Sequence, residues 1–301
     1  MKTADNSEKT GALCALCPRK CLADRTAGRG YCGCGSRVMI ARAALHEWEE
    51  PCITGGRGAG AVFFCGCPLH CVYCQNSAIS GGAGGREVTP ERLKAIFARL
   101  IKEGAYCIDL VSPTQYSDVL ADVLSTPLPV PVVWNSGGYD AVGQLKALEG
   151  RIDIYMPDFK YSDGEVAAKY SRAPDYPEVA LAAIREMYRQ TGPARFDKNG
   201  NMLGGVIIRH LVLPGELENT FGVMDAVSSE FPRGEVVFSL MSQYTPCGGI
   251  SGFENLQRRL TPGEYRRAVD YMYLCGIDLG YMQELSSAKE EYIPPFDLTG
   301  V

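Results

Sequence analysis

The sequence predicts an α/β fold, a partial (β/α)6 barrel that is open on one side and carries a cysteine-rich N-terminal extension. Three observations lead to this class. Short apolar runs alternate with amphipathic helical segments after residue 60, which is the pattern of parallel strands joined by helices. Six strand–helix units can be counted, fewer than the eight that close a full barrel. Before them lies a segment with several cysteines and no clear apolar period, which cannot build a core of its own.

The predicted elements follow one another in a regular order. The first strand is the apolar run that begins at residue 61, and the others cover 107–112, 130–134, 152–160, 205–213 and 235–243. The predicted helices cover 90–101, which Thr89 caps, and 116–124, 141–148, 177–191 and 262–275. Residues 1–54 are assigned to the extension and a hinge, and residues 55–301 to the barrel. The glycine-rich stretch 55–60 precedes a strand, so it is interpreted as a flexible approach and not as a phosphate loop.

Composition limits the class of protein. Of 301 residues, 46% are hydrophobic and 22% charged, as in ordinary soluble enzymes, and the net charge of −5 argues against a general nucleic-acid binder. No apolar run approaches the ~18 residues of a membrane span, and the first residues lack a signal-peptide core, so a cytoplasmic location is expected. In a reducing compartment, thirteen cysteines indicate metal binding and not disulfides.

The most informative stretch is the loop after the first strand, where Cys67, Cys71 and Cys74 are spaced C-x3-C-x2-C. Three thiolates on one loop can hold three irons of a cubane cluster, which leaves the fourth iron open. Structural zinc, the alternative, favours paired C-x2-C knuckles closed by a fourth ligand. The spacing therefore favours a [4Fe-4S] cluster. Cys65 lies on the same strand face as Cys67, but we expect it not to close the open iron.

A second group of cysteines lies in the extension. Cys14, Cys17, Cys21 and Cys32 form C-x2-C-x3-C-x10-C, which suits zinc or a second iron–sulfur cluster. Ligand softness alone does not choose between these metals. The basic residues around them could form a solvated face or bind phosphate or RNA, but we interpret them as offsetting the charge of a tetrathiolate centre.

Polar side chains stand where the predicted strands end, and the C-terminal ends of parallel strands are where ligands bind. Asp158 and Lys160 share one face, and such charges are costly to bury unless they are matched or bind something. Arg209 could grip a carboxylate through two hydrogen bonds, whereas the adjacent His210 points to the opposite face, where a lone histidine is more often a packing residue. The remaining candidates at strand ends are Ser112, Thr114, Asn135, Ser136 and Gln243.

The segment that joins the extension to the barrel contains His46, Glu47, Glu49 and Glu50 beside Trp48. These groups could form an acid–base or metal site. A solvated hinge is the interpretation that the sequence favours.

Together these motifs resemble a known family. C-x3-C-x2-C with an aromatic residue, here Tyr73, before the last cysteine is the signature of the radical SAM superfamily. From Cys14 to about Gly276 the chain resembles its pyruvate formate-lyase-activase-related branch, and more closely the PflX-like subgroup. The shared motifs stand at residues 16–21, 46–51, 74–80, 135–139, 153–161, 186–190, 209–215 and 241–244.

The resemblance implies a TIM-like partial barrel of radical SAM type, with S-adenosylmethionine (SAM) chelating the open iron. It implies that Tyr73 supports the adenine, that Lys160 contacts SAM, and that Arg209 matches an activase arginine. Ser112 and Thr114 take the place of a Gly-Gly-Glu motif that binds the SAM amine in relatives. Asn135, Ser136, Met156 and Asp158 resemble a monovalent-cation site. The expected cofactor-binding set is Tyr73, Ser112, Thr114, Asn135, Ser136, Asp158, Lys160, Arg209 and Gln243, with Lys160 and Arg209 as candidate catalytic residues.

Two functions follow from the resemblance. The first is an activating enzyme that uses a low-potential electron donor to form a 5′-deoxyadenosyl radical and abstracts hydrogen from a glycine of a partner protein, a glycyl radical enzyme. The second is a radical SAM enzyme acting on a small molecule, a peptide or RNA, although the acidic net charge weighs against RNA. A non-enzymatic iron–sulfur electron carrier is the third hypothesis, and it fails if SAM is cleaved on reduction.

Overall fold

One continuous sheet organises the computed structural model, which describes residues 13–285 and 294–301. Its strand order is β10-β9-β8-β6-β5-β4-β2-β1-β3, and β7 pairs with β8. Neighbouring strands from β2 to β10 are parallel, whereas β1, β3 and β7 run antiparallel to their neighbours. The strands are β1 (Val38–His46), β2 (Ala59–Phe64), β3 (Arg86–Val88), β4 (Ile108–Val111), β5 (Val132–Ser136), β6 (Ile154–Pro157), β7 (Arg195–Phe196), β8 (Met202–Leu211), β9 (Val237–Met241) and β10 (Gly280–Met282).

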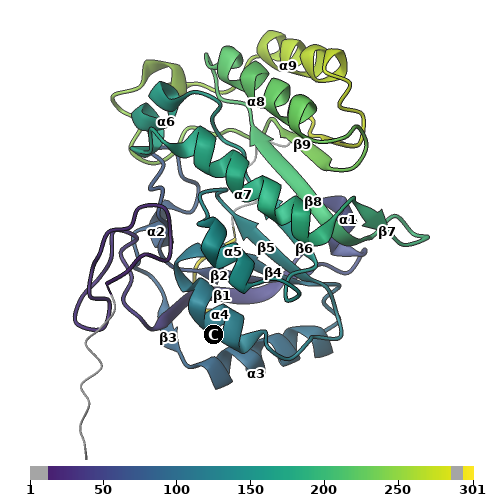
Figure 1. The fold of residues 1–301 in the computed structure, drawn as a ribbon. Coiled ribbons are helices and arrows are strands. Elements are labelled where there is room, and N and C mark those ends of the chain that lie inside the picture. Colours follow the sequence, from purple (N-terminus) through teal and green to yellow (C-terminus); the bar gives the residue numbers. More distant parts are fainter. Residues whose placement is uncertain (1–12, 286–293) are drawn as a thin grey trace, which may run out of the picture.

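Helices connect the parallel strands. They are α1 (Pro51–Thr54), α2 (Ser77–Ser80), α3 (Pro90–Lys102), α4 (Ser117–Val123), α5 (Val142–Ala147), α6 (Gly164–Ser171), α7 (Tyr176–Thr191), α8 (Leu217–Glu230) and α9 (Pro262–Leu274), with 3-10 turns at Thr114–Tyr116 and Glu254–Gln257. Local sequence explains their starts: Thr89 accepts a hydrogen bond from the Arg92 amide, and Thr261 forms a reciprocal capping box with Glu264. Figure 1 shows α3, α4, α5 and α7 on one side of the sheet.

The two faces of the sheet carry separate apolar layers because side chains alternate along each strand. Trp134 and Tyr155 face the layer that the helices complete. Their neighbours Val133 and Ile154 point to the other face, where Cys52 and Ile53 of α1 pack against them. Both layers are fully buried. The strand ends between these layers are where the candidate site is found.

The predicted α/β class with a parallel sheet is confirmed, and each of the six predicted strands is present. The strand predicted at 152–160 is shorter, because β6 ends at Pro157. Beyond the end of β6, Asp158 forms an isolated β-bridge with Arg209, and Lys160 lies in the following loop. The elements that were not predicted are β3, β7, β10, α1, α2, α6 and the 14-residue helix α8.

The extension, residues 13–37, has no helix or strand. Two arginines fasten it to the rest of the chain. Arg19 donates from Nε to the Pro68 carbonyl (2.8 Å) and from Nη2 to the Ser171 carbonyl (2.7 Å). Arg25 is buried and donates to the Gln115 carbonyl (2.7 Å) while its guanidinium lies over the Tyr116 ring. These two cations therefore have a visible structural role, which the sequence interpretation, an offset for thiolate charge, did not include.

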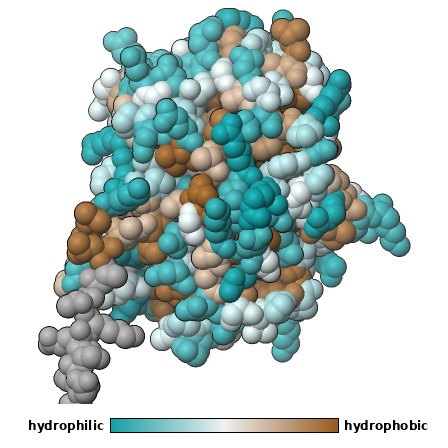
Figure 2. Space-filling view, in the orientation of Figure 1, coloured by the Kyte–Doolittle hydropathy of each residue, from teal (hydrophilic) through white to brown (hydrophobic). Residues whose placement is uncertain are grey.

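No helix in residues 13–285 and 294–301 is long and apolar enough to cross a bilayer. On the face shown in Figure 2, hydrophobic residues occur in small groups among hydrophilic ones. Isolated apolar groups of this kind are normal on folded proteins.

Candidate functional site

A cavity of about 630 Å³ opens at the C-terminal ends of the parallel strands. This volume lies within the range of ~300–1,000 Å³ that is usual for small-molecule sites. The predicted site residues that line it are Cys67, Cys71, Tyr73, Cys74, Ser112, Asn135, Ser136, Asp158, Lys160, Arg209 and Gln243. The structure therefore brings together, at one place, residues that come from six different strand ends and loops.

The cysteine loop supplies one wall of the cavity. It turns away from β2 at Gly66, whose φ of 84° favours glycine. There is also no room for a side chain, because a Cβ there would lie 2.3 Å from the Cys34 sulfur. The Cys67 sulfur accepts a hydrogen bond from the Leu69 amide (3.4 Å), and the Cys71 sulfur accepts one from the Ser171 hydroxyl (3.0 Å). Such donors stabilise thiolate charge.

The three thiols also act on one another. Burial raises the pKa of Cys67 to about 11, and the neighbouring Cys71 adds to this shift. Burial raises the pKa of Cys74 to about 12, again with Cys71 and Cys67 adding to it. Three thiolates held this close without a cation repel each other, and a bound positive centre removes that cost. In the ranges that the structure describes, no three His, Cys, Asp or Glu side chains converge as ligands of one metal ion. Three thiols on one loop are a donor set that suits a cluster of several irons.

Cys65 does not join these thiols. Its side chain is fully buried with Ala61, Phe63 and Val111, and it is absent from the wall of the cavity. The expectation that it does not complete the ligand set is consistent with this placement.

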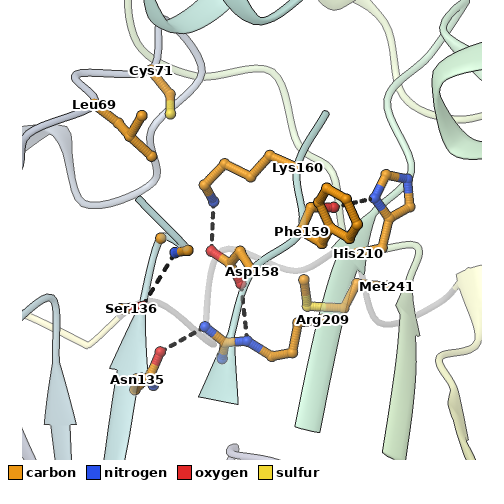
Figure 3. A network of polar contacts seen from close by, with 12 residues as sticks. Leu69, Cys71, Asn135, Ser136, Asp158, Phe159, Lys160, Arg209, His210 and Met241 are labelled. Atoms are coloured by element: carbon orange, nitrogen blue, oxygen red, sulfur yellow. Dashed lines mark hydrogen bonds and ion pairs between the residues drawn. The ribbon is translucent and has the colours of Figure 1, made fainter. Parts of the chain in front are cut away.

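A charged network crosses the cavity opposite the cysteine loop (Figure 3). Asp158 accepts from Lys160 Nζ through Oδ2 (2.5 Å) and from Arg209 Nε through Oδ1 (3.0 Å). Arg209 also donates to Asn135 Oδ1 (2.6 Å) and lies 3.5 Å from Glu49 Oε2. The strand-end charges are therefore both an ion-pair network and part of a cavity wall.

The ionisation of this network is fixed by its pairing. Burial raises the pKa of the Asp158 carboxyl, but Lys160 and Arg209 outweigh burial and hold that pKa below its usual value. Burial likewise opposes the charge on Lys160, but Asp158 and the Cys71 thiolate raise its pKa to about 12. Asp158, Lys160 and Arg209 are thus charged at neutral pH.

Thr114 and Ser136 were predicted to bind a cofactor, but their hydroxyls donate to the buried carboxylate of Asp140. Thr114 lies outside the large cavity, and its hydroxyl donates to Asp140 Oδ1 (2.7 Å). Ser136 lines the cavity, but its hydroxyl donates to the other oxygen of Asp140 (2.5 Å). Asp140 is buried and needs these donors, which is why the hydroxyls turn toward it. Ser112 remains at the wall, in a left-handed conformation with φ of 57°.

Tyr73 and Gln243, which line the cavity, are hydrogen-bonded to neighbouring side chains. The Tyr73 hydroxyl shares a hydrogen bond with the Tyr161 hydroxyl (2.7 Å), and its ring meets those of Tyr170 and Tyr244 edge-on. Gln243 Oε1 accepts from Gln283 Nε2 (3.2 Å). Met156, part of the cation site that the resemblance implies, points its side chain into the apolar layer that packs against α1. Both carboxylate oxygens of Asp158 in that site are taken by Lys160 and Arg209.

His210 is a packing residue, as the alternation along β8 predicted. It is fully buried, with Nδ1 2.7 Å from the Phe159 carbonyl oxygen and Nε2 3.0 Å from the Thr220 hydroxyl. Burial lowers its pKa from 6.5 to about 4. Because the folded-state pKa is depressed, stability is full above pH 6.5 and is lost as pH falls toward 4.

We expect this single group to contribute about 3 kcal/mol of stability at neutral pH, all of it lost below pH 4. Urea unfolding at pH 7.5 and pH 5 should show the loss in the wild type. The His210→Gln variant should be less stable at pH 7.5 but should depend less on pH. Identical pH slopes for the two proteins would contradict this assignment.

In the joining segment, which the sequence interpretation treated as a solvated hinge, Glu47 and Trp48 are exposed but Glu49 and Glu50 are not. Glu49 and Glu50 fold into the cavity wall, and Glu50 is only 8% exposed. Glu49 approaches Asp109 of β4, which was not selected from the sequence. A carboxylate inside the apolar strand Ile108–Val111 was the signal that could have identified Asp109.

The protein has a parallel α/β sheet with a thiol-lined cavity at the C-terminal ends of its strands. Its fold is similar to that of SuiB of Streptococcus suis. SuiB bound to S-adenosylmethionine matches with a TM-score of 0.50 at 14% identity, over 75% of this chain and 50% of SuiB. SuiB bound to the precursor peptide SuiA gives 0.49 and 12%, over 74% and 48%. The chain thus spans about half the length of these structures, and the likeness concerns the fold alone.

Among curated proteins, the uncharacterized protein MJ0674 of Methanocaldococcus jannaschii is 28% identical over 282 residues, covering 89% of this chain and 76% of that protein. No family model matches the sequence.

Proposed function

We propose that this chain is a radical SAM enzyme. The observation that carries the proposal is that Cys67, Cys71 and Cys74, spaced C-x3-C-x2-C on one loop, line the same cavity as Asp158 and Lys160. A cavity shared by three thiols and a charged network suits an iron–sulfur cluster beside a polar ligand. SuiB, which binds S-adenosylmethionine, has the same fold, and this supports the proposal. In this proposal the parallel sheet corresponds to the partial barrel expected for this class of enzyme.

Cys67, Cys71 and Cys74 would hold a [4Fe-4S] cluster. When bound, this cluster supplies the electron that cleaves SAM to methionine and a 5′-deoxyadenosyl radical.

The residues of the chain would bind and orient SAM and exclude water from the cavity. Lys160 and Arg209 would offer charged N–H donors to the polar groups of SAM, and Asp158 fixes both donors in place. Ser112, in its left-handed conformation, lines the cavity, where it can serve the SAM amine. Tyr73, supported by Tyr161, closes the side of the cavity next to Cys74 and excludes water.

The direct test is anaerobic reconstitution with iron and sulfide, followed by reduction in the presence of SAM. The proposal requires methionine and 5′-deoxyadenosine in equal amounts. An iron-loaded chain that transfers electrons without cleaving SAM would instead be an electron carrier.

For the substrate, we propose an activating-enzyme-like reaction on a glycine of a partner protein, with a low-potential electron donor. The PflX-like motifs support this role. A reaction on a peptide is the alternative, and the fold of SuiB, crystallised with a precursor peptide, makes it worth testing. Electron paramagnetic resonance separates the two: the activase reaction leaves a long-lived glycyl radical on the partner, whereas peptide modification leaves none.

We also propose a second metal centre at Cys14, Cys17, Cys21 and Cys32. A Cβ added to Gly30 would lie 3.3 Å from the Cys21 sulfur and 3.6 Å from the Cys32 sulfur, so these two thiols are neighbours. Cys14 shares a hydrogen bond with Cys21, and the charges of Cys32, Cys14 and Cys21 act on Cys17. Four thiols on a segment without helix or strand suit zinc or an iron–sulfur cluster that orders it.

A Cys14→Ser/Cys17→Ser double variant should lose either about one zinc or about four irons per chain. Elemental analysis of the purified chain measures this directly and identifies the metal. Cys275→Ala, which removes a thiol at the end of α9, is the matched control and should keep the full metal content. An unchanged content in the double variant would exclude the second centre.

A further inference from the structure

Residues 294–301 return to the sheet and pair with β1. The Leu298 amide donates to the Ala41 carbonyl (3.0 Å), and the Ala43 amide donates to the Thr299 carbonyl (2.9 Å). Both partners lie on β1 just beyond the part of this strand that pairs with β3. Segment 294–301 therefore covers backbone groups of β1 that lie past the end of β3.

Two arginines hold the segment in place. Arg42 donates from Nη1 to the Pro295 carbonyl (3.1 Å) and to Asp297 Oδ1 (2.8 Å). Arg99 of α3 donates from Nη2 to the Gly300 carbonyl (3.2 Å), and the C mark in Figure 1 stands close to this helix. Both halves of the segment are thus fixed by side chains from distant parts of the chain.

The side chain of Phe296 belongs to a small apolar layer. It packs against a cluster of buried residues, which are Ala41, Ala61, Phe63, Cys65, Ile79 and Val111. Phe63 of β2 precedes the cysteine loop, and Ile79 of α2 follows it. The Gly66 amide donates to the Ile79 carbonyl (2.9 Å) and so joins the two ends of the loop. Phe296 therefore packs against the layer that holds both ends of the cysteine loop.

Phe63 connects this layer to the cavity. The rings of Phe296 and Phe63 meet edge-on, with centroids 5.6 Å apart. Phe63 lines the cavity together with Pro294 and with His46, whose ring also meets Phe63 edge-on. Because the Phe63 ring contacts two other rings, it has little freedom to move away from the cavity wall.

We propose that Phe296 is a positioning residue for SAM, which holds Phe63 in the cavity wall and stabilises both ends of the cysteine loop. The inference rests on the proposed function and gives segment 294–301 a part in it. Phe296 does not line the cavity itself, so it acts through Phe63. An edge-on aromatic contact changes an equilibrium constant by up to about tenfold, so its loss is measurable as ligand affinity.

Amide hydrogen exchange in the metal-free chain tests this packing without any cofactor. Phe296→Ala should exchange faster than the wild type in peptides that cover 61–80, and at the wild-type rate in peptides of α7, which packs in the other apolar layer. Phe296→Tyr keeps the ring and should restore the wild-type rates. An equal rise in exchange throughout the Phe296→Ala chain would show general destabilisation and overturn the proposal.

The matched control lies in the same segment. Val301→Ala shortens a side chain that packs against the layer completed by the helices, and not against the layer of Phe63. It should leave exchange at 61–80 and SAM affinity as in the wild type. The same loss in Val301→Ala as in Phe296→Ala would assign the effect to the segment as a whole and overturn the role of Phe296.

SAM affinity is the second readout. In iron-loaded chains, equilibrium dialysis should give a dissociation constant about tenfold higher for Phe296→Ala than for the wild type, at equal iron content. Phe296→Tyr should bind SAM as the wild type does. In the cleavage assay the KM for SAM should rise while kcat is retained, because the three thiols and Lys160 are unchanged. Loss of iron from Phe296→Ala would make the contact purely structural and overturn the positioning role.

A second variant is available if Phe296→Ala does not fold. Asp297→Ala removes the half-exposed partner of Arg42 and should release the segment, with faster exchange at 61–80 and weaker SAM binding. Wild-type exchange and SAM affinity in the variants overturn the proposal. If the wild type neither binds nor cleaves SAM, the proposed function fails, whereas exchange in metal-free chains still shows whether Phe296 stabilises the loop. The two failures are therefore distinguishable.

Discussion

The Cys71→Ala variant should lose SAM cleavage completely, because it removes one of three thiolates that together must hold the cluster. A cubane requires its ligands jointly, so the variant should also lose about four irons per chain relative to the wild type. Cys71 is central in position: its sulfur accepts from Ser171, and its charge acts on both Cys67 and Cys74. Deoxyadenosine formation and iron content, measured on the same reconstituted samples, test this.

The matched control is Cys275→Ala, which changes one thiol far along the chain, at the C-terminal end of α9. It should cleave SAM at the wild-type rate and retain the same iron. A Cys71→Ala chain that keeps both its iron and its SAM cleavage would refute the assignment of the cysteine loop.

The second large effect is expected at Arg209. Arg209→Met should lower the free energy of unfolding by about 3–5 kcal/mol, because it leaves Asp158 and Glu49 buried beside a side chain that cannot pair with them. This corresponds to a fall in Tm of roughly 10 °C. Thermal unfolding followed by circular dichroism, with metal-free chains to exclude effects of the cluster, measures the change.

Arg233→Met is the comparison. Arg233 also forms an ion pair with a carboxylate, Asp278, but its side chain is 71% exposed. The cost there should stay below about 1 kcal/mol, as is usual for surface pairs. Similar losses in the two variants would show that the buried network contributes no more than a surface one.

The sequence was sufficient for features that depend on local pattern. Six strands, the helix cap at Thr89 and the opposite directions of Arg209 and His210 follow from periodicities of the chain. That the cysteine loop meets Asp158 and Lys160 also follows, because the C-terminal ends of parallel strands share one edge.

Features that depend on tertiary packing could not be obtained in this way. The packing of α1 against Val133 and Ile154 of the sheet decides whether Glu49 and Glu50 face solvent or the cavity. No local sequence pattern encodes this packing. The Thr114 hydroxyl donates to buried Asp140 and does not line the large cavity. The acceptor lies 26 residues away along the chain, so local sequence could not indicate this contact. Helix α8 was overlooked although its buried residues, such as Val223 and Val227, have helical spacing.

The fastening of the extension by Arg19 has a mechanical consequence. One guanidinium holds the backbone of the cysteine loop at Pro68 and the end of α6 at Ser171, and the Ser171 hydroxyl in turn donates to the Cys71 sulfur. Extension and loop therefore cannot shift independently. Any event that loosens residues 13–37, such as loss of a metal from them, is transmitted through Arg19 and Ser171 to a thiol in the wall of the cavity.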